Sequence, residues 1–213
     1  MGRRFGRGQV ALSGGRSRSG IAGLVLAAGQ SSRMGRPKAT LEFGGRTFAG
    51  HGVELLRAAG CDPILLVAGA HPLDAPAGAT VVHNPKWPLG PLASLQCGLR
   101  RALELAPASH ALVVHHVERP RVRVETLVAL LALLEREPGS LVQPSHQGRS
   151  GHPMIWPREL FDALLALDPE QETARTLVRG SAASRRRKLE TDDPGVVDNI
   201  DTPADLQALL ESC

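Results

Sequence analysis

The feature that most constrains the fold of this chain is a regular alternation of short apolar runs with longer amphipathic segments. Ile21–Leu26 is continuously apolar, whereas Pro91–Leu105 carries apolar residues at steps of three and four, the spacing of one helix face. This alternation predicts an α/β fold, a three-layer, mostly parallel sheet with helices on both faces. We expect strands over 21–28, 63–68, 80–83, 111–114, 141–143 and 154–156, and helices over 49–59, 91–105, 124–134, 159–167, 170–178 and from Pro203 onward.

Length and charge indicate one folded domain preceded by a basic tail. The 213 residues suit a single domain. The net charge is +4, but five of the 25 basic residues lie in a Gly/Ser-rich opening that has no acidic residue: Arg3, Arg4, Arg7, Arg16 and Arg18. Without those five, 20 basic side chains stand against 21 acidic ones. We therefore expect a disordered tail over residues 1–19 and one domain over 20–213.

The composition does not favour nucleic acid as a partner. Aromatic residues make up 3% of the chain and Tyr is absent, so platforms for base stacking are scarce. A second basic run, 185–188, is interpreted as a solvated loop or a strand edge. A nucleic-acid-binding module built on the arginine tail is the weakest alternative function.

The sequence also carries no sign of a membrane or a secretory route. The longest wholly apolar helical stretch, 127–134, is too short to cross a bilayer, and the first twenty residues lack the apolar segment of a signal peptide. The three cysteines are widely spaced and form no disulfide or zinc pattern. We expect a cytoplasmic protein.

A Gly-rich loop, Leu26-Ala27-Ala28-Gly29-Gln30-Ser31-Ser32-Arg33-Met34-Gly35-Arg36-Pro37-Lys38, directly follows the first strand. Its small residues let backbone N–H groups approach phosphate oxygens, and Arg33 and Lys38 offset phosphate charge. Ligands of parallel sheets lie beyond the carboxyl ends of the strands, where this loop begins. The loop thus predicts a triphosphate site. Its spacing fits neither a Walker A loop nor the G-x-G-x-x-G dinucleotide fingerprint.

The same loop resembles the signature L-A-A-G-x-S-x-R-M-G-x-x-K of the MobA-like nucleotidyltransferases, which include the molybdenum cofactor cytidylyl- and guanylyltransferases. The resemblance extends over roughly residues 20 to 210. It implies a Rossmann-like nucleotidyltransferase fold and transfer of a nucleoside monophosphate from a triphosphate to a phosphorylated acceptor such as molybdopterin, with release of pyrophosphate. It also assigns Arg33 and Lys38 to catalysis at the β- and γ-phosphates. The residues assigned to the nucleotide itself are Leu26, Ala27, Ala28, Gly29 and Ser31.

A second segment of the resemblance runs from Asn84-Pro85-Lys86-Trp87 to Gly90-Pro91-Leu92-Ala93-Ser94-Leu95. It is similar to the segment around the base and ribose in this family, which implies that Asn84, Gly90 and Ser94 bind the nucleotide. A Gly-Pro turn into a helix would place free N–H groups near an anion or a base edge. A simple turn and helix start explains the segment equally well.

Two carboxylates are implied as the Mg²⁺ ligands. Glu118 stands in Val117-Glu118-Arg119-Pro120, where the family pattern V-D-x-P has Asp, and its extra methylene moves the carboxylate by more than about 1 Å. Asp201 lies in a segment similar to the closing I-D-T-P of the family. The alternatives are a surface carboxylate paired with Arg119 or Arg121 for the first, and a helix N-cap before Pro203 for the second.

A further segment, Gly148-Arg149-Ser150-Gly151-His152-Pro153, is similar to a G-R-x-G-H-P segment of the cytidylyltransferase-like branch, where it borders the acceptor pocket. His152 is therefore a candidate ligand of the acceptor, or else a structural histidine. His115 and His116 precede Glu118 without a third ligand at zinc spacing, and we interpret them as strand-end residues.

The L-A-A-G form of the loop favours CTP over GTP as the triphosphate substrate, with Mg²⁺ as cofactor. The resemblance further implies a molybdoenzyme or its chaperone as a protein partner. Two alternatives stay open. One is a sugar- or alcohol-phosphate nucleotidyltransferase; the other is a nucleotide-binding regulator or chaperone with weakened catalysis, which Glu118 would favour.

Overall fold

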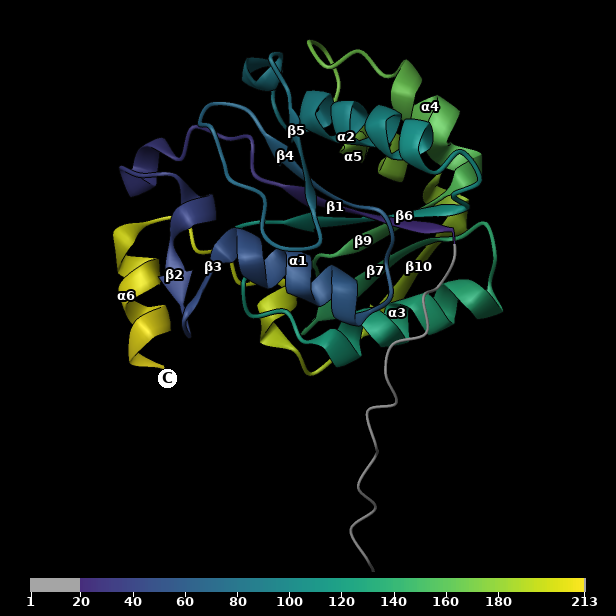
Figure 1. Ribbon diagram of the computed structural model, residues 1–213. Coiled ribbons are helices and arrows are strands. Elements are labelled where there is room, and N and C mark those ends of the chain that lie inside the picture. Colours follow the sequence, from purple (N-terminus) through teal and green to yellow (C-terminus); the bar gives the residue numbers. More distant parts are fainter. Residues whose placement is uncertain (1–19, 213) are drawn as a thin grey trace, which may run out of the picture.

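The computed structural model describes residues 20–212, so the basic tail expected over residues 1–19 lies outside the described residues. The fold is a sheet of eight strands with helices on both faces (Figure 1). Its strands are β1 (Ile21–Leu26), β4 (Ile64–Ala68), β5 (Thr80–His83), β6 (Ala111–His116), β7 (Leu141–His146), β8 (Arg149–Ser150), β9 (Met154–Pro157) and β10 (Arg186–Glu190). The helices are α1 (Phe48–Ala58), α2 (Pro91–Leu105), α3 (Val124–Arg136), α4 (Phe161–Ala166), α5 (Ala174–Arg179) and α6 (Pro203–Glu211).

The order of the strands places the Gly-rich loop at the middle of the sheet. The path is β10-β7-β9-β6-β1-β4-β5, and β8 pairs with β7. β1 runs parallel to both of its neighbours, β4 and β6, with Leu26 opposite His116 at the carboxyl ends. β9 is antiparallel to β6 and β7. The prediction of a mostly parallel α/β sheet covered on both faces is confirmed, and the segments after β1 and β6 emerge side by side.

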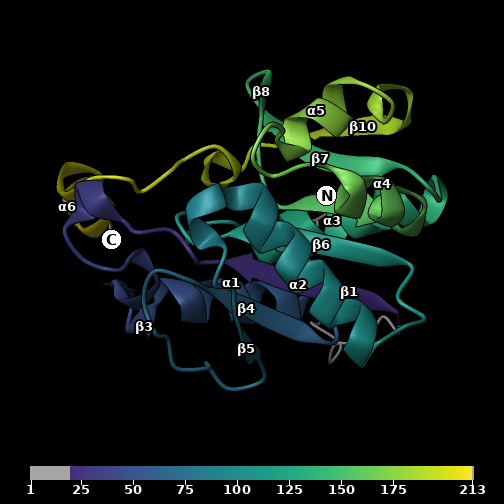
Figure 2. The same ribbon diagram turned by 90° about the horizontal axis from the view of Figure 1, so that it is seen from above.

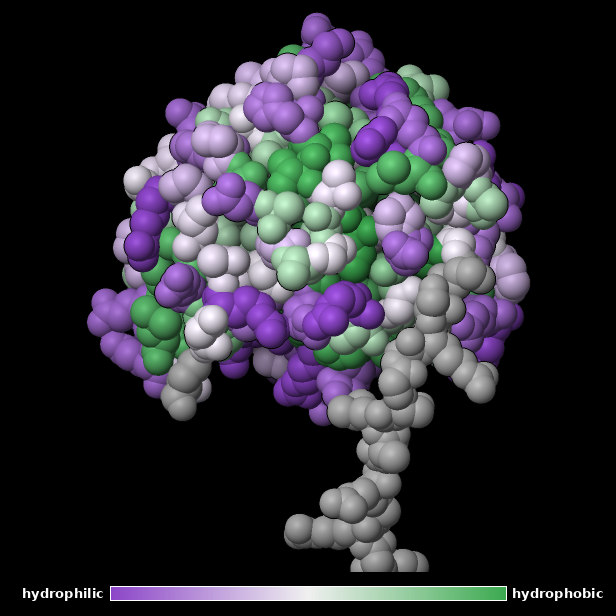
Figure 3. All heavy atoms as spheres, viewed as in Figure 1, coloured by the Kyte–Doolittle hydropathy of each residue, from purple (hydrophilic) through white to green (hydrophobic). Residues whose placement is uncertain are grey.

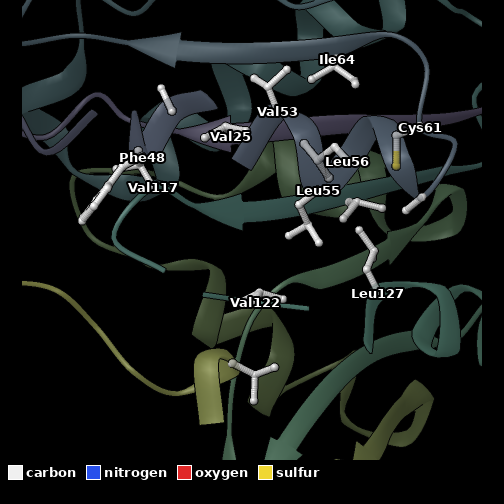
Figure 4. Close-up of a cluster of buried hydrophobic side chains, with 14 of the residues drawn as sticks. Val25, Phe48, Val53, Leu55, Leu56, Cys61, Ile64, Val117, Val122 and Leu127 are labelled. Atoms are coloured by element: carbon white, nitrogen blue, oxygen red, sulfur yellow. The ribbon is translucent and has the colours of Figure 1, made fainter. Parts of the chain in front are cut away.

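Alternate residues of the strands form two apolar layers. In β1, Val25 faces the layer of α1 and α3, whereas Leu24 faces the layer of α2, α4 and α5. Figure 2 looks down on the second set of helices, and Figure 4 shows the first layer, with Val25, Leu56 and Leu127 converging between sheet and helices. Both faces of β1 are thus buried, which is why its sequence is continuously apolar.

Two segments differ from the sequence prediction, and for a third the structure decides between two interpretations. The helix expected over 170–178 begins only at Ala174, because the preceding residues turn around Asp168, whose side chain accepts the N–H of Glu170 at 2.9 Å. The basic run at 185–188 enters the edge strand β10, which confirms the strand-edge interpretation. The short hairpin of β2 (Glu42–Phe43) and β3 (Arg46–Thr47) was not anticipated, since two-residue strands leave no periodic pattern.

The surface of the described residues shows hydrophobic patches set between hydrophilic side chains on the face drawn in Figure 3. The large apolar side chains that are exposed are Leu105, Val128 and Leu210. Within residues 20–212, no helix has the length and apolar character needed to cross a membrane.

Candidate active site

The loop after β1 is held in shape by its own residues. Ser31 adopts a left-handed backbone conformation (φ 56°), and its carbonyl accepts the N–H of Met34 at 2.9 Å, which closes a 3-10 turn. The Met34 side chain is buried in the core, so it anchors the turn. The Ser31 hydroxyl then accepts the N–H of Lys38 at 3.1 Å. These contacts fix the position of Lys38 relative to the end of β1.

The loop forms one wall of a small cavity of about 170 Å³ at the carboxyl ends of β1 and β6. Most of the residues assigned to the site from the sequence meet here, although they come from three distant parts of the chain. The lining consists of Leu26, Ala27, Gly29, Ser31, Ser32, Arg33, Lys38, Val117, Glu118 and Asp201. Two cations and two carboxylates therefore share one cavity with the Gly-rich backbone.

Asp201 contacts two cations of the loop, Lys38 and Arg33. Its Oδ1 accepts a hydrogen bond from the Lys38 ammonium and lies 3.5 Å from a guanidinium nitrogen of Arg33. The Lys38 side chain is only 13% exposed, whereas that of Arg33 is 69% exposed. Lys38 is thus a fixed cation inside the cavity, and Arg33 is a more mobile one at its mouth.

Glu118 is an ionised carboxylate in a largely buried setting. Desolvation alone would raise its pKa, but the interaction with the His116 side chain, its own backbone N–H and the charge of Lys38 together lower the pKa to about 2. Nδ1 of His116 lies 3.3 Å from Oε1 of Glu118. The pairing with Arg119 or Arg121 that the sequence left open is not the one the structure shows.

Backbone and side-chain hydrogen bonds tie the two carboxylate-bearing segments together. The N–H of Ile200 donates to the carbonyl of Glu118 at 2.9 Å. The Arg119 guanidinium donates to Oδ1 of Asn199 at 2.8 Å and to the carbonyl of Val196. These bonds fix the segment before Asp201 against the end of β6. From the sequence, Arg119 was considered only as a partner of Glu118, because its contacts with Asn199 and Val196 join parts of the chain about eighty residues apart.

The cap of α6 is separate from the cavity. Thr202 is the N-cap residue, and it exchanges hydrogen bonds with Asp205 in a capping box. Asp201 precedes this cap, and its carboxylate points to Lys38 and Arg33 instead. The N-cap alternative therefore applies to Thr202 and leaves Asp201 available to the cavity.

The donor set of the cavity fits a Mg²⁺ ion. Glu118 and Asp201 supply hard carboxylate oxygens, and Mg²⁺ is usually bound by one or two carboxylates together with substrate phosphates and water. No cluster of three or more His, Cys, Asp or Glu side chains suited to a metal occurs among residues 20–212. A metal here would therefore take its other ligands from the substrate and the solvent.

A second and larger cavity, of about 630 Å³, adjoins the first and shares Leu26 with it. One wall is apolar and includes Leu92, Met154 and Trp156. The polar part of the lining carries three arginines, of which Arg175 and Arg179 were not singled out from the sequence and Arg186 belongs to the basic run 185–188. This part consists of Gln143, Ser150, Gly151, His116, His152, Glu172, Thr173, Arg175, Arg179 and Arg186. The cavity thus offers both an apolar surface and positive charge.

Two sets of contacts hold parts of the second cavity wall in place, one at Arg186 and one at Gly151. Arg186 donates to Oε1 of Gln143 at 3.1 Å and to the Ser150 hydroxyl at 3.0 Å, so its charge is held in place. Gly151 packs against the backbone of Val196, where a Cβ would lie only 2.2 Å from the carbonyl oxygen. The expected segment around His152 therefore does border a cavity next to the loop.

Four residues assigned to the nucleotide do not line either cavity. Asn84 and Ser94 are buried and bonded to each other, Nδ2 to Oγ at 3.1 Å, and the Asn84 carbonyl oxygen accepts the N–H of Lys86. Gly90 adopts a positive φ before α2, and the Ala28 methyl packs toward Gly69. The structure gives these residues local structural contacts, and their expected binding of nucleotide stays a prediction.

His115 is buried on the face of β6 opposite to His116. Its ring lies against α1, where a Cβ on Gly52 would come within 3.1 Å of Cδ2, and its Nδ1 has no hydrogen-bond partner among the described residues. Desolvation by burial, reinforced by the electrostatic interaction with His116, lowers the pKa of His115 to about 3. Folding therefore keeps this histidine neutral.

Replacing His115 by leucine is expected to remove an acid sensitivity of the fold. The pKa of His115 is 6.5 in the unfolded chain and about 3 in the folded protein. The free energy of unfolding therefore has its full value above about pH 6.5. It decreases as the pH falls from 6.5 toward 3, because the unfolded chain then binds a proton that the folded protein does not. The loss is about 1.4 kcal/mol per pH unit, or about 2 kcal/mol between pH 7 and pH 5. Urea unfolding at these two pH values should show that difference in wild type and not in His115→Leu. The exposed His83→Leu is the control, which should follow wild type.

The chain is similar to proteins of one family. It matches the model of the MobA-like NTP transferase domain over residues 23–188. It is 33% identical to the molybdenum cofactor guanylyltransferase of Rhizobium meliloti, over 86% of this chain and 88% of the relative, and 30% identical to that of Rhizobium johnstonii, over 89% and 91%. The crystal structure of Rv0371C from Mycobacterium tuberculosis in complex with manganese superposes with a TM-score of 0.67 at 26% identity, covering 92% of this chain and 100% of the other. The matched region contains the loop after β1, Glu118 and all the residues that line the second cavity. The chain belongs to the MobA-like NTP transferase family.

Proposed function

We propose that this nucleotidyltransferase transfers a nucleoside monophosphate from a triphosphate bound at the loop after β1 to a phosphorylated acceptor bound in the second cavity. The observation that carries the proposal is the convergence of Arg33, Lys38, Glu118 and Asp201 on one cavity that adjoins the other at Leu26. A phosphate oxygen of the acceptor attacks the α-phosphorus, a new P–O–P bond forms, and pyrophosphate leaves with the electrons of the broken bond.

The chain contributes position and charge to this reaction. The N–H of Ala27 is donated to the carbonyl of Val67, so the backbone at Ala28 and Gly29 offers its N–H groups to the triphosphate. Lys38 and Arg33 turn from Asp201 toward the β- and γ-phosphates. Lys38 thereby stabilises the charge that develops on the departing pyrophosphate. No protein nucleophile is required, because the acceptor itself supplies the attacking oxygen.

Glu118 and Asp201 are the residues that would hold Mg²⁺. When bound, the ion neutralises charge on the phosphate oxygens and helps to align them. Asp201 has two roles in this proposal: it keeps Lys38 and Arg33 in place before the nucleotide binds, and it releases them when phosphates compete for their charge.

The second cavity suits an acceptor that is flat on one side and anionic on the other. Trp156, Met154 and Leu92 offer an apolar surface to a heterocycle, and Arg175, Arg179 and Arg186 offer charge to a phosphate. Molybdopterin has both features, and the guanylyltransferase relatives support it as the acceptor. The nucleotidylated product would then pass to a molybdoenzyme or its chaperone.

The donor nucleotide is the point on which loop sequence and relatives disagree. The L-A-A-G form favours CTP, but Ala28 is buried, packs toward Gly69 and is not part of the cavity lining. The relatives that cover nearly nine-tenths of the chain are guanylyltransferases. We therefore propose GTP as the first donor to test, with CTP as the competing one.

The experiment is a transfer assay with purified full-length chain, Mg²⁺ and molybdopterin, run separately with GTP, CTP, ATP and UTP. Pyrophosphate release and the mass of the product are measured with and without acceptor. Acceptor-dependent release with one nucleotide supports the proposal, and the product mass identifies the donor. Nucleotide binding without any release would identify a regulator instead, and release that needs a sugar phosphate would identify the other alternative.

Replacing Gly29 by alanine is expected to weaken nucleotide binding without affecting the fold. Gly29 lines the cavity, and a Cβ built there meets no atom within 4 Å. A methyl group would stand between the backbone and the phosphates, and losing a hydrogen bond to a charged group should raise the Kd for the triphosphate about 10-fold. Calorimetric titration with the nucleotide measures this change.

The neighbouring exposed Gln30→Ala is the matched control for Gly29→Ala, since Gln30 is not part of the cavity lining. Both variants should unfold at the wild-type urea concentration. Wild-type affinity in Gly29→Ala would show that the phosphates do not approach this backbone.

A further inference from the structure

His116 lies between the two cavities. It is the last residue of β6 and stands opposite Leu26 of β1, which both cavities share. Its ring lines the larger cavity, while its Nδ1 lies 3.3 Å from Oε1 of Glu118, which lines the smaller one. One histidine therefore contacts the carboxylate of the nucleotide cavity from the side of the acceptor cavity.

We propose that His116 is a positioning residue that holds the Glu118 carboxylate in the orientation needed to bind a divalent cation. This inference rests on the function proposed above. Glu118 has one more side-chain torsion than an aspartate would have, so its carboxylate can swing out of the cavity unless a partner restrains it. Among residues 20–212, no nitrogen of another Lys, Arg or His lies within 4.0 Å of this carboxylate.

The His116 ring is itself fixed by packing. It lies against the ring of His152, with centroids 4.2 Å apart and planes inclined by 56°. The N–H of His152 donates to the carbonyl of Val196 at 2.9 Å, on the segment that leads to Asp201. The ring that contacts Glu118 is thus supported by the same segment that carries the second carboxylate. A partner held in this way restrains a metal ligand better than a mobile surface cation would.

The test measures metal binding in the absence of acceptor, so that contacts of His116 with the acceptor do not contribute. Mn²⁺ is titrated by electron paramagnetic resonance into protein saturated with a non-hydrolysable triphosphate analogue. His116→Leu should weaken Mn²⁺ binding about 10-fold, the lower end of what loss of a ligand's partner costs. His116→Asn places an amide N–H near the position of Nδ1 and should stay within about 3-fold of wild type.

The same measurement in protein that carries Glu118→Asp separates a positioning role of His116 from a general effect on packing. The shorter side chain has fewer rotamers and does not reach the His116 ring, so His116→Leu should change Mn²⁺ affinity less than about 2-fold there. A general defect in packing would lower the affinity equally in both backgrounds. His146→Leu is the matched control, because this half-buried histidine bonds the Thr191 carbonyl and lines neither cavity.

Each outcome separates this inference from the proposed function. A wild-type chain that binds neither nucleotide nor Mn²⁺ contradicts the proposed function. A wild-type chain that binds both, with His116→Leu binding Mn²⁺ equally well, overturns the inference alone. Equal losses from His116→Leu with Glu118 and with Glu118→Asp would also overturn it. Thermal unfolding of each variant confirms that the folded protein is being compared.

Discussion

Replacing Lys38 by methionine is expected to lower kcat/KM for nucleotidyl transfer by roughly 10²- to 10³-fold, the usual cost of removing one fixed group that stabilises charge in the transition state. Lys38 is only 13% exposed and is held by Asp201 and by the backbone bond to Ser31. When the triphosphate binds, the Lys38 ammonium turns from Asp201 to the phosphates, and it is then in place before charge builds up on the leaving pyrophosphate. Methionine keeps the length and apolar stem of the side chain and removes the charge.

Lys86→Met is the control, since Lys86 is exposed and lines neither cavity. It should transfer nucleotide at the wild-type rate. Lys38→Met also leaves Asp201 with Arg33 as its remaining cation, so urea unfolding of both variants is measured beside the kinetics. A Lys38→Met enzyme within 3-fold of wild type would mean that the triphosphate is bound elsewhere.

The architecture could be predicted because the pattern that encodes it is local. Both faces of β1 are buried, so its residues are continuously apolar, and the apolar steps of three and four in α2 follow from packing one helix face on the sheet. The direction of β9 could not be predicted in the same way. Its four residues have no periodicity, and only pairing with β6 and β7 makes it antiparallel. The late start of α5 depends on hydrogen bonds of Asp168 that helix propensity does not reveal.

The same distinction applies to the site: residues within one local segment could be predicted, and contacts that only the fold creates could not. Arg33 and Lys38 lie in one continuous loop, so their spacing is visible in the sequence. Glu118 and Asp201 required a family resemblance, because 83 residues separate them and only the fold brings them together. Arg175 and Arg179 were missed, although a pair of arginines one helical turn apart is a signal for a shared face. His116 was treated as a strand-end residue, since nothing in the sequence shows that its ring meets Glu118.

Neutralising Glu118 is the second change from which we expect a large effect. Glu118→Gln keeps the shape of the side chain and its contact distance to His116, but it removes the negative charge. Because the pKa of Glu118 is about 2, the carboxylate is fully ionised at neutral pH, and the substitution removes one whole charge from the cavity. We expect kcat to fall roughly 10²-fold, together with a weaker dependence of the rate on Mg²⁺ concentration.

The Glu118→Asp variant shows whether an effect of Glu118→Gln comes from the lost charge or from the changed side chain. It keeps the charge and shortens the side chain, so the rate should stay at the wild-type level or rise. A large loss in both variants would show that the site needs the length of glutamate as well as its charge, as the contact with His116 allows. A loss in Glu118→Gln alone would show that charge is sufficient. Wild-type rates in both variants would remove Glu118 from the metal site and leave Asp201 as its carboxylate, because Asp201 is the one other acidic side chain within residues 20–212 that lines this cavity.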